Sequence, residues 1–281
     1  MYQLTEKTDN VHYEDDEILK RKAIDEFTKF IQEHPYIKFN GETDELSVLA
    51  FLRARKYVIP RSKELYERAC LFVKQNPEIC ILDEEKYTKI LDLYDTGAIT
   101  VMKERDALGR RIILCATKKF DTSKYTLDDT MRLFNLILCV LSFEEDTQKN
   151  GTIFINDLNG LSLSHLKLFP YKMLANYSSY MNISVVKIKE IYVVGMPSIA
   201  VQLFKAIRYV LDDKNRSRLQ VMSDLGNLWQ FVDQSKMSTD YGGKSFTDME
   251  TLYDFKSIII SNKKRIFELS KKFIINTKNK Y

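Results

Sequence analysis

The periodicity of apolar residues changes along this chain, and the change restricts the fold more than any other feature of the sequence. From residue 98 to residue 222, short runs rich in β-branched residues alternate with longer segments whose apolar residues recur every three or four positions. We expect strands at residues 98–102, 110–116, 151–157, 190–194 and 218–222, and helices at residues 127–147, 163–181 and 200–211. This βαβαβ order predicts a mostly parallel sheet covered by helices, after a first hairpin that turns at Gly109.

In the region before this alternation, apolar residues recur only at the three- or four-residue spacing of helices. Pro35 and Pro77 end two of its helical segments, because proline cannot continue a helix and restricts the residue before it. We therefore expect a helical N-terminal bundle over residues 1–90, packed on an α/β domain over residues 91–281 that ends in one or two further helices. The expected inner faces consist of Ile24, Phe27 and Ile31, of Leu46, Leu49 and Ala50, of Leu65, Ala69 and Phe72, and of Tyr87, Ile90, Leu91 and Tyr94.

The segment FLRARK supplies two arginines that point to different sides of a helix, because alternate residues diverge by about 200°. We expect Arg53 or Arg55 to connect the bundle to the α/β domain. Removal of the residues before Glu42 is expected to be tolerated. A cut after Tyr57 is expected to expose apolar surface and to cause aggregation.

Composition restricts the class of protein. The 281 residues are 44% hydrophobic and 29% charged, which excludes a disordered or fibrous chain. Forty-three bases and 39 acids leave a formal net charge of +4, so an anion site must be a local cluster rather than a general field. The four cysteines lack paired spacing and are expected to be reduced and buried. A polar N-terminus and no long apolar run predict a cytoplasmic protein, and we expect a monomer.

Common enzyme motifs do not occur in the sequence: it contains no GxSxG, no GxGxxG after a strand and no GxxxxGK[ST]. His165 and Asp157 form either a catalytic pair or ordinary structural hydrogen bonds. The adjacent Asp212 and Asp213 point about 100° apart on a helix, as at a solvated helix end. We expect no catalysis, no cofactor and no metal site.

The stretch from Gly195 to Met222 joins an apolar helix to a basic segment. Apolar side chains cover most of the helix circumference and leave only Gln202, Lys205 and Arg208 as a polar stripe. Such a helix is either buried on all sides or covers something apolar.

Several blocks of sequence, in this order and spacing, resemble the CRAL-TRIO lipid-transfer family from about Thr43 to Gly243. The blocks are FLRARKY followed by NPEI, GRRIILC, NG before IFINDLNGLSLSH, IYVVGMP before the apolar helix, and DYGG. The resemblance is specific because several independent blocks agree. The chain departs from the family at GMP, where relatives have Asn-x-Pro, at RYVL, where many have Lys-Pro-Phe-Leu, and at MSTDYGG, where Leu-Pro-x-Glu-Tyr-Gly-Gly is usual. The second departure changes the helix that relatives use as a gate.

The resemblance implies a CRAL-TRIO-type α/β domain whose sheet forms the floor of an apolar cavity closed by a gate helix. It implies binding and transfer, without reaction, of one hydrophobic lipid: a retinoid, tocol, carotenoid, sterol or phospholipid. A protein-interaction module of the same fold is the alternative function, and plain core packing is the alternative for each lining residue. The expected lining residues are Phe134, Ile137, Leu138, Leu141, Ser142, Phe154, Ile155, Leu161, Leu166, Tyr180, Ile191, Val193, Val201, Phe204, Ile207 and Leu211.

Basic residues follow the apolar helix, and by themselves they are an ordinary surface feature. Lys214 and Arg218 are four residues apart and share a helix face, whereas Arg216 points away and is expected to be a solvated charge. The resemblance adds Lys187 and Arg55, because the matching positions of tocopherol carriers form a basic cleft for phosphoinositide headgroups. The implied partners are a lipid ligand and a phosphoinositide-containing membrane surface, and no nucleic acid. Unconnected solvated charges are the alternative.

Overall fold

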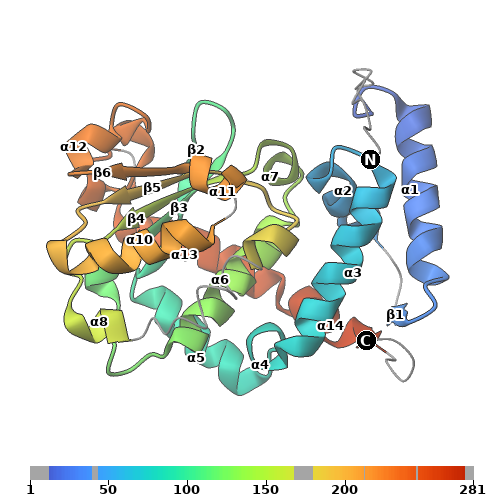
Figure 1. Ribbon diagram of the computed structural model, residues 1–281, viewed down its shortest axis with the longest axis horizontal. Helices are drawn as coiled ribbons and strands as arrows, with labels where there is room; N and C mark the ends of the chain where they lie inside the picture. Colours follow the sequence, from blue (N-terminus) through green and yellow to red (C-terminus); the bar gives the residue numbers. More distant parts are fainter. Residues whose placement is uncertain (1–12, 40–43, 168–179, 212, 245, 276–281) are drawn as a thin grey trace.

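The computed structural model describes residues 13–39, 44–167, 180–211, 213–244 and 246–275 (Figure 1). Its secondary structure confirms the mixed α/β class predicted from the alternating periodicity. The α-helices are α1 (Glu17–Gln32), α2 (Glu45–Ala54), α3 (Ile59–Gln75), α4 (Pro77–Cys80), α5 (Glu84–Asp95), α6 (Leu127–Leu141), α7 (Glu145–Asn150), α8 (Leu163–Lys167), α10 (Val201–Val210), α11 (Asp213–Ser217), α12 (Leu225–Leu228), α13 (Asp248–Ser261) and α14 (Lys263–Lys272). Figure 1 shows α1, α2 and α3 at one end of the molecule.

A five-stranded sheet forms the other end of the molecule, as Figure 1 shows. The strands described are β1 (Ile37–Phe39), β2 (Ile99–Arg105), β3 (Arg111–Ala116), β4 (Thr152–Asp157), β5 (Ile188–Val194), β6 (Leu219–Met222) and β7 (Phe273–Ile275). The order in the larger sheet is β2-β3-β4-β5-β6, with β2 and β3 antiparallel and the later neighbours parallel. Gly109 turns the first hairpin with φ of 71°, a conformation that favours glycine. The predicted hairpin and parallel sheet are confirmed.

The two faces of this sheet pack against different layers because successive strand residues point to opposite faces. One face contacts α5, α6 and α13 and forms the main core. Its inward strand residues are Val101, Ile113, Phe154, Ile191 and Val193. The other face packs against α12 and the segment that follows it, through Ile112, Leu114, Ile153, Ile155, Tyr192 and Val194.

The DYGG segment closes the second face of the sheet. Tyr241 is buried, and its hydroxyl donates a hydrogen bond to Asp157 Oδ2 (3.0 Å) at the end of β4. A side chain at Gly243 would place a Cβ only 1.7 Å from the Met237 carbonyl oxygen, so this position has no room for any other residue. The motif therefore fixes the layer beneath the sheet.

The expected single helix over residues 127–147 is two helices, α6 and α7. Ser142 ends α6, and its hydroxyl donates to the Cys139 carbonyl (2.6 Å). Arg105 and Arg111 hold Glu144, the residue before α7, at 2.7 Å and 2.6 Å. These contacts turn the chain, and apolar periodicity does not record them. The expected helix over residues 163–181 begins with α8, and residues 168–179 lie outside the described residues.

The N-terminal helices have a core of their own, formed by α1, α2 and α3 around Phe27, Leu52 and Tyr66. The expected boundary at residue 90 falls inside α5, whose Tyr87, Ile90, Leu93 and Tyr94 belong to the main core. The strands β1 and β7 pair antiparallel and join the chain's C-terminal part to the N-terminal helices. Neither strand is expected from the sequence, because each is only three residues long.

Arg53 connects the N-terminal helices to the α/β part, as expected for one of the two arginines. Its guanidinium is buried and donates to Gln148 Oε1 (2.7 Å) and Glu145 Oε1 (2.8 Å) of α7. It also pairs with Glu14 (2.6 Å). Burial acts to raise the pKa of Glu14, but the hydrogen bonds from Arg53 and Tyr57 outweigh burial and lower it to about 2.

Candidate functional site

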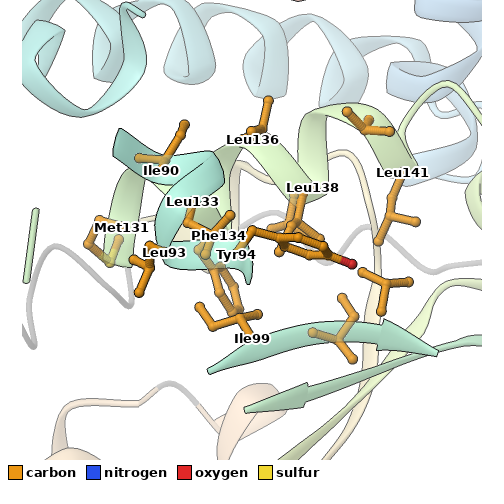
Figure 2. Packing of buried hydrophobic residues seen from close by; sticks show 14 of the residues in the cluster. Ile90, Leu93, Tyr94, Ile99, Met131, Leu133, Phe134, Leu136, Leu138 and Leu141 are labelled. Carbon is orange, nitrogen blue, oxygen red and sulfur yellow. The ribbon is translucent and has the colours of Figure 1, made fainter. Parts of the chain in front are cut away.

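The expected lipid-lining residues of α6 and the sheet lie together in the main core. Phe134 of α6 stacks on Phe154 of β4 with ring centroids 4.9 Å apart. Figure 2 shows Phe134 and Leu141 among packed side chains between α6, α5 and strand β2. Ile137, Leu138, Leu141, Ile191 and Val193 belong to the same buried cluster. These residues form a continuous apolar layer on the face of the sheet that carries Phe154.

Ile155 does not lie with the other expected residues. It follows Phe154 in β4 and therefore points to the opposite face, where it packs with Ile153 and Tyr192. The expectation that both neighbours line one cavity is wrong for Ile155. Leu161 and Leu166 are half-buried in the turn after β4 and in α8.

The helix α10 lies on the sheet side of the molecule and is only partly embedded (Figure 1). Phe204 packs against the main core, but none of the described α10 side chains is fully buried. Val201 and Ile207 are half-buried, and Leu211, just after the helix, is buried. Tyr209 is 84% exposed, so the helix also presents apolar surface to solvent. This pattern fits a helix that covers an apolar surface better than one buried on all sides.

Arg216 holds the carboxyl end of α10, a role that the sequence analysis missed. Its guanidinium donates to the carbonyl oxygens of Leu211 (2.8 Å) and Arg208 (3.1 Å). The last carbonyls of a helix lack partners within the helix, and a cation there is also favoured by the helix dipole. Arg216 is 40% exposed, as expected for a solvated charge, and in addition it caps this helix end.

An apolar pocket of about 250 Å³ lies between the N-terminal helices and the α/β part. Its walls come from α2, α3, α6, α14 and residues 180–185. Three of the expected lipid-lining residues, Leu138, Ser142 and Tyr180, line this pocket. Helical spacing alone does not find it, because residues far apart in the sequence enclose the space. We call this space the apolar pocket.

Two polar side chains of the apolar pocket donate hydrogen bonds to other residues of its lining. The Tyr180 hydroxyl donates to Asn135 Oδ1 (2.7 Å), and Ser142 donates to the Cys139 carbonyl. The described residues that line the pocket are all uncharged. The pocket therefore suits an apolar group and offers no ionic partner to a bound anion.

Basic side chains from separate segments meet beside the pocket. Lys187 is half-buried, and the charged groups that act on it most strongly are Lys189, Lys56, Lys214 and Arg55, in that order. The positive charge of Arg218 in turn helps to lower the pKa of Lys189. The structure thus brings together all four expected bases, Arg55, Lys187, Lys214 and Arg218, and adds Lys56 and Lys189. We call these six residues the basic cluster.

Asn182 holds two of the contributing segments together. Its carbonyl oxygen accepts a hydrogen bond from Arg55 Nη2 (2.9 Å), and its side-chain oxygen accepts one from Asn215 Nδ2 (3.3 Å) in α11. The turn after α2 also brings Lys56 into place through an uncommon left-handed conformation with φ of 53°. The basic cluster is therefore a built arrangement of three segments rather than a chance surface mixture.

The electrostatics of the cluster are unfavourable for its own positive charges. Burial and then the neighbouring bases lower the pKa of Lys187 from 10.5 to about 8. Holding a partly buried cation among other cations costs free energy, and a bound anion would relieve that cost. Phosphate oxygens suit this site because they accept charge-assisted hydrogen bonds from Lys and Arg.

His165 makes structural hydrogen bonds, as one of the two interpretations expects. Its Nδ1 lies 2.7 Å from Ser162 Oγ, and its Nε2 lies 3.2 Å from the Phe120 carbonyl oxygen. Asp157 instead accepts a hydrogen bond from the Tyr241 hydroxyl.

Burial raises the pKa of Cys80, Cys115 and Cys139 to about 12, so these thiols are poor nucleophiles. Among the described residues there is no cluster of His, Cys, Asp and Glu able to hold a metal ion.

Comparison with known proteins identifies one domain family. The model of the CRAL/TRIO domain matches residues 95–243, just over half of the chain. Within the described part of the chain, every helix is too short or too polar to cross a bilayer.

Curated relatives agree with this match. Alpha-tocopherol transfer protein-like from Homo sapiens is 27% identical over 210 residues, which cover 74% of this chain and 61% of that protein. Clavesin-1 from Xenopus laevis is 28% identical over 209 residues, which cover 72% of this chain and 61% of that protein. Clavesin-2 from Rattus norvegicus is 24% identical over 243 residues, which cover 86% of this chain and 71% of that protein. The chain thus spans about three fifths of the length of the first of these relatives.

A solved structure shares the fold. The crystal structure of Sfh5 superposes with a TM-score of 0.53 and 14% sequence identity, over 86% of this chain and 97% of that one. At this identity the likeness concerns the fold alone.

Proposed function

Because this chain belongs to the CRAL/TRIO domain family, we propose that it binds one small hydrophobic lipid and transfers it between membranes. The family consists of lipid-binding and lipid-transfer proteins. The proposed lipid is a retinoid, tocol, carotenoid, sterol or phospholipid, carried without chemical change by a monomeric protein.

The proposed lipid site lies between α10 and the sheet face that carries Phe154. Its lining is the expected set from α6, β4, β5 and α10, without Ile155. Phe204 and Ile207 contribute the α10 side of the site, and both are only half-buried. A lipid that replaces part of the contact between α10 and this face would gain about 25 cal/mol per Å² of apolar area removed from water.

Docking on phosphoinositide-containing membranes is the second part of the proposal, with Arg55, Lys187, Lys214 and Arg218 as headgroup ligands. The observation that carries it is the continuity of α10 with the basic cluster: α10 is followed directly by α11, which supplies Lys214. Each Lys or Arg side chain near an anionic membrane surface contributes about 1 kcal/mol to the free energy of membrane binding. The exposed Tyr209 suits the membrane interface, where aromatic side chains are favoured. Docking would then place α10 against the bilayer, where it can move and release the lipid.

Extraction of the purified protein tests the carrier function. The full chain is purified from a eukaryotic host and extracted with organic solvent, and the extract is quantified by mass spectrometry. We expect about one lipid per protein molecule, with the lipid chemically intact. A protein that contains no lipid and takes up none from vesicles would instead be an interaction module. Recovery of a chemically altered lipid would indicate an enzyme.

Vesicle flotation tests the docking step separately. Vesicles with phosphoinositide are compared with vesicles of equal total charge that contain phosphatidylserine, at low and high salt. We expect stronger binding to the phosphoinositide vesicles and a loss of binding as salt rises. Equal binding to both vesicle types would exclude specific headgroup recognition.

A further inference from the structure

The apolar pocket lies mostly outside the proposed lipid site, on another side of α6, and shares only Leu138 and Ser142 with the α6 part of that site. On this helix Phe134 faces the sheet through its stacking on Phe154, whereas Asn135, Cys139 and Ser142 line the pocket. At 100° per residue, these three residues point about 80–140° away from Phe134. The volume of about 250 Å³ is below the roughly 300–1,000 Å³ of sites that enclose a whole drug-sized ligand. The pocket therefore suits one apolar chain rather than a complete lipid.

The segments that line the pocket continue into the basic cluster. Phe51 of α2 lines the pocket, and Arg55 follows it by four residues, one helical turn away. Likewise, Ser184 and Val185 line the pocket, and Lys187 follows them by two or three residues. A molecule that binds between these two segments meets apolar side chains at one end and cations at the other.

Asn182 connects this apolar end and this cationic end in space. It precedes the pocket residue Ile183, and its carbonyl oxygen accepts a hydrogen bond from Arg55 Nη2 (2.9 Å). Two separate chain segments, α2 and residues 180–187, are therefore in direct contact where the apolar lining gives way to bases.

We propose that the apolar pocket accepts one acyl chain of the anionic lipid whose headgroup binds the basic cluster. This inference rests on the proposed docking function and adds a chain site to it. Charge complementarity selects the occupant: the cluster attracts phosphate, while the uncharged lining admits a hydrocarbon chain and no second charge. A phospholipid has both parts, whereas a free inositol phosphate has only the headgroup. Docking then includes the withdrawal of one chain from the bilayer into the protein.

Three cysteines provide a test on the unmodified protein. Cys80 and Cys139 are half-buried and line the pocket, whereas Cys115 lies on β3 and is not among the pocket's lining residues. The pKa of each of the three thiols is raised by burial to about 12, so their intrinsic reactivities at one pH are similar. Differences in their alkylation rates therefore report access.

Alkylation by N-ethylmaleimide is followed by mass spectrometry with monoacyl phosphatidylinositol phosphate or with the matching soluble inositol phosphate. We expect the monoacyl lipid to slow alkylation of Cys80 and Cys139 at least fivefold and to leave Cys115 unchanged. The soluble inositol phosphate should protect none of them. Protection of Cys115 alone, or of no cysteine at saturating lipid, would overturn the proposal.

Pocket-filling variants test the same proposal by affinity. Ala69 and Val73 of α3 line the pocket and are half-buried, so Ala69→Phe and Val73→Phe fill it without burying a polar group. Gln75→Phe adds the same ring to an exposed position of α3 and serves as the matched control. We expect the wild-type protein and Gln75→Phe to bind the monoacyl lipid at least tenfold more tightly than the soluble headgroup. In Ala69→Phe and Val73→Phe, the ratio of the affinity for the monoacyl lipid to the affinity for the soluble headgroup should fall below threefold. Their affinity for the soluble headgroup should stay unchanged.

The outcomes separate this inference from the docking function. If the wild-type protein binds both compounds equally, the acyl-chain site is excluded and headgroup docking stands. If neither compound binds, docking itself fails and the chain site fails with it. Unchanged ratios in both filled variants, with thermal unfolding showing that they are folded, would also overturn the proposal.

Discussion

Single residues of this protein show which charges are stabilised by the fold and which are held at a cost. Arg53 is almost completely buried, but Glu14, Glu145 and Gln148 surround its guanidinium with acceptors. Lys187 is half-buried, and the four side-chain charges that act on it most strongly are all positive. Arg53 therefore connects the two parts of the molecule, whereas the charge of Lys187 is held at a cost, as the proposed anion site requires.

The pH dependence of stability tests this interpretation of Lys187. Its folded-state pKa of about 8 lies below its ordinary value of 10.5, so the unfolded state binds more protons between these two pH values. The free energy of unfolding should therefore rise from pH 8 to pH 10.5 as the cost of the charge disappears. Lys187→Met removes the charge and should stabilise the protein at pH 7 by roughly 1–3 kcal/mol, with little difference above pH 10.5.

Denaturant unfolding at several pH values measures this difference. Lys22→Met, at an exposed position of α1, is the control and should leave stability within about 0.5 kcal/mol of wild type at every pH. A Lys187→Met variant that is less stable than wild type at pH 7 would show that Lys187 has a stabilising partner.

At the scale of elements, α10 differs from the other long helices of the main core. Figure 2 shows α5 and α6 contributing fully enclosed side chains, whereas none of the described α10 side chains is fully buried. Arg216 holds its last turn through backbone carbonyls. The helix is thus attached at its end by Arg216 and along its length by a half-buried apolar face.

Aspartate substitution distinguishes the proposed gate helix α10 from the packed core. Phe204→Asp in α10 should keep the helical circular dichroism signal and a cooperative unfolding transition, because the half-buried site can expose the charge to water. Lipid uptake should be lost. Phe134→Asp in α6 buries the same charge in the core, where an unpaired charge costs several kcal/mol, and should unfold the protein. A folded Phe204→Asp variant with normal lipid uptake would contradict the assignment of α10 to the lipid site.

The sequence predicted elements well where one periodicity extends over a whole segment. The parallel strands and the faces of α1, α3 and α5 follow from such spacing. The break between α6 and α7 does not, because it depends on Glu144 meeting Arg105 and Arg111 from distant strands. The strands β1 and β7 stabilise each other only through pairing across the whole chain. Local patterns do not carry such long-range contacts.

The same limit applies to the candidate site. The bases were predicted one by one, from helical spacing and family resemblance, and the structure places Arg55 and Lys214 near Lys187 and Arg218 near Lys189. The apolar pocket was not predicted, because it is enclosed by segments more than 100 residues apart. Ile155 was assigned to the wrong face although strand alternation was available to separate it from Phe154.

At the scale of the whole molecule, the N-terminal helices and the α/β part are joined at several places. Arg53 contacts α7, the apolar pocket lies between the two parts, and β7 returns to pair with β1. We therefore expect the chain to unfold as one structural unit and the N-terminal helices to be needed for its stability.

Deletion of residues 1–41 tests this unity and opposes the tolerance expected from the sequence. The deletion removes α1 and β1, exposes apolar residues of α2 and α3, and leaves β7 without a partner. We expect a lower midpoint of thermal unfolding and aggregation detected by light scattering. Phe27→Ala, which opens a cavity at a fully buried position, should cost about 3–5 kcal/mol in the full chain. A monomeric deletion variant with an unchanged midpoint would show that these helices are dispensable.

The central claim is that the basic cluster docks the protein on phosphoinositide membranes so that α10 can release the lipid. The most direct test is the rate of lipid transfer to acceptor vesicles as their phosphoinositide content increases. The double variant Lys187→Ala and Arg218→Ala should flatten this dependence and remove most of the salt sensitivity, with lipid affinity in solution nearly unchanged. A control with Lys22→Ala and Lys29→Ala, both exposed on α1, should follow the wild-type curve. Identical curves for wild type and the Lys187 and Arg218 variant would contradict the account.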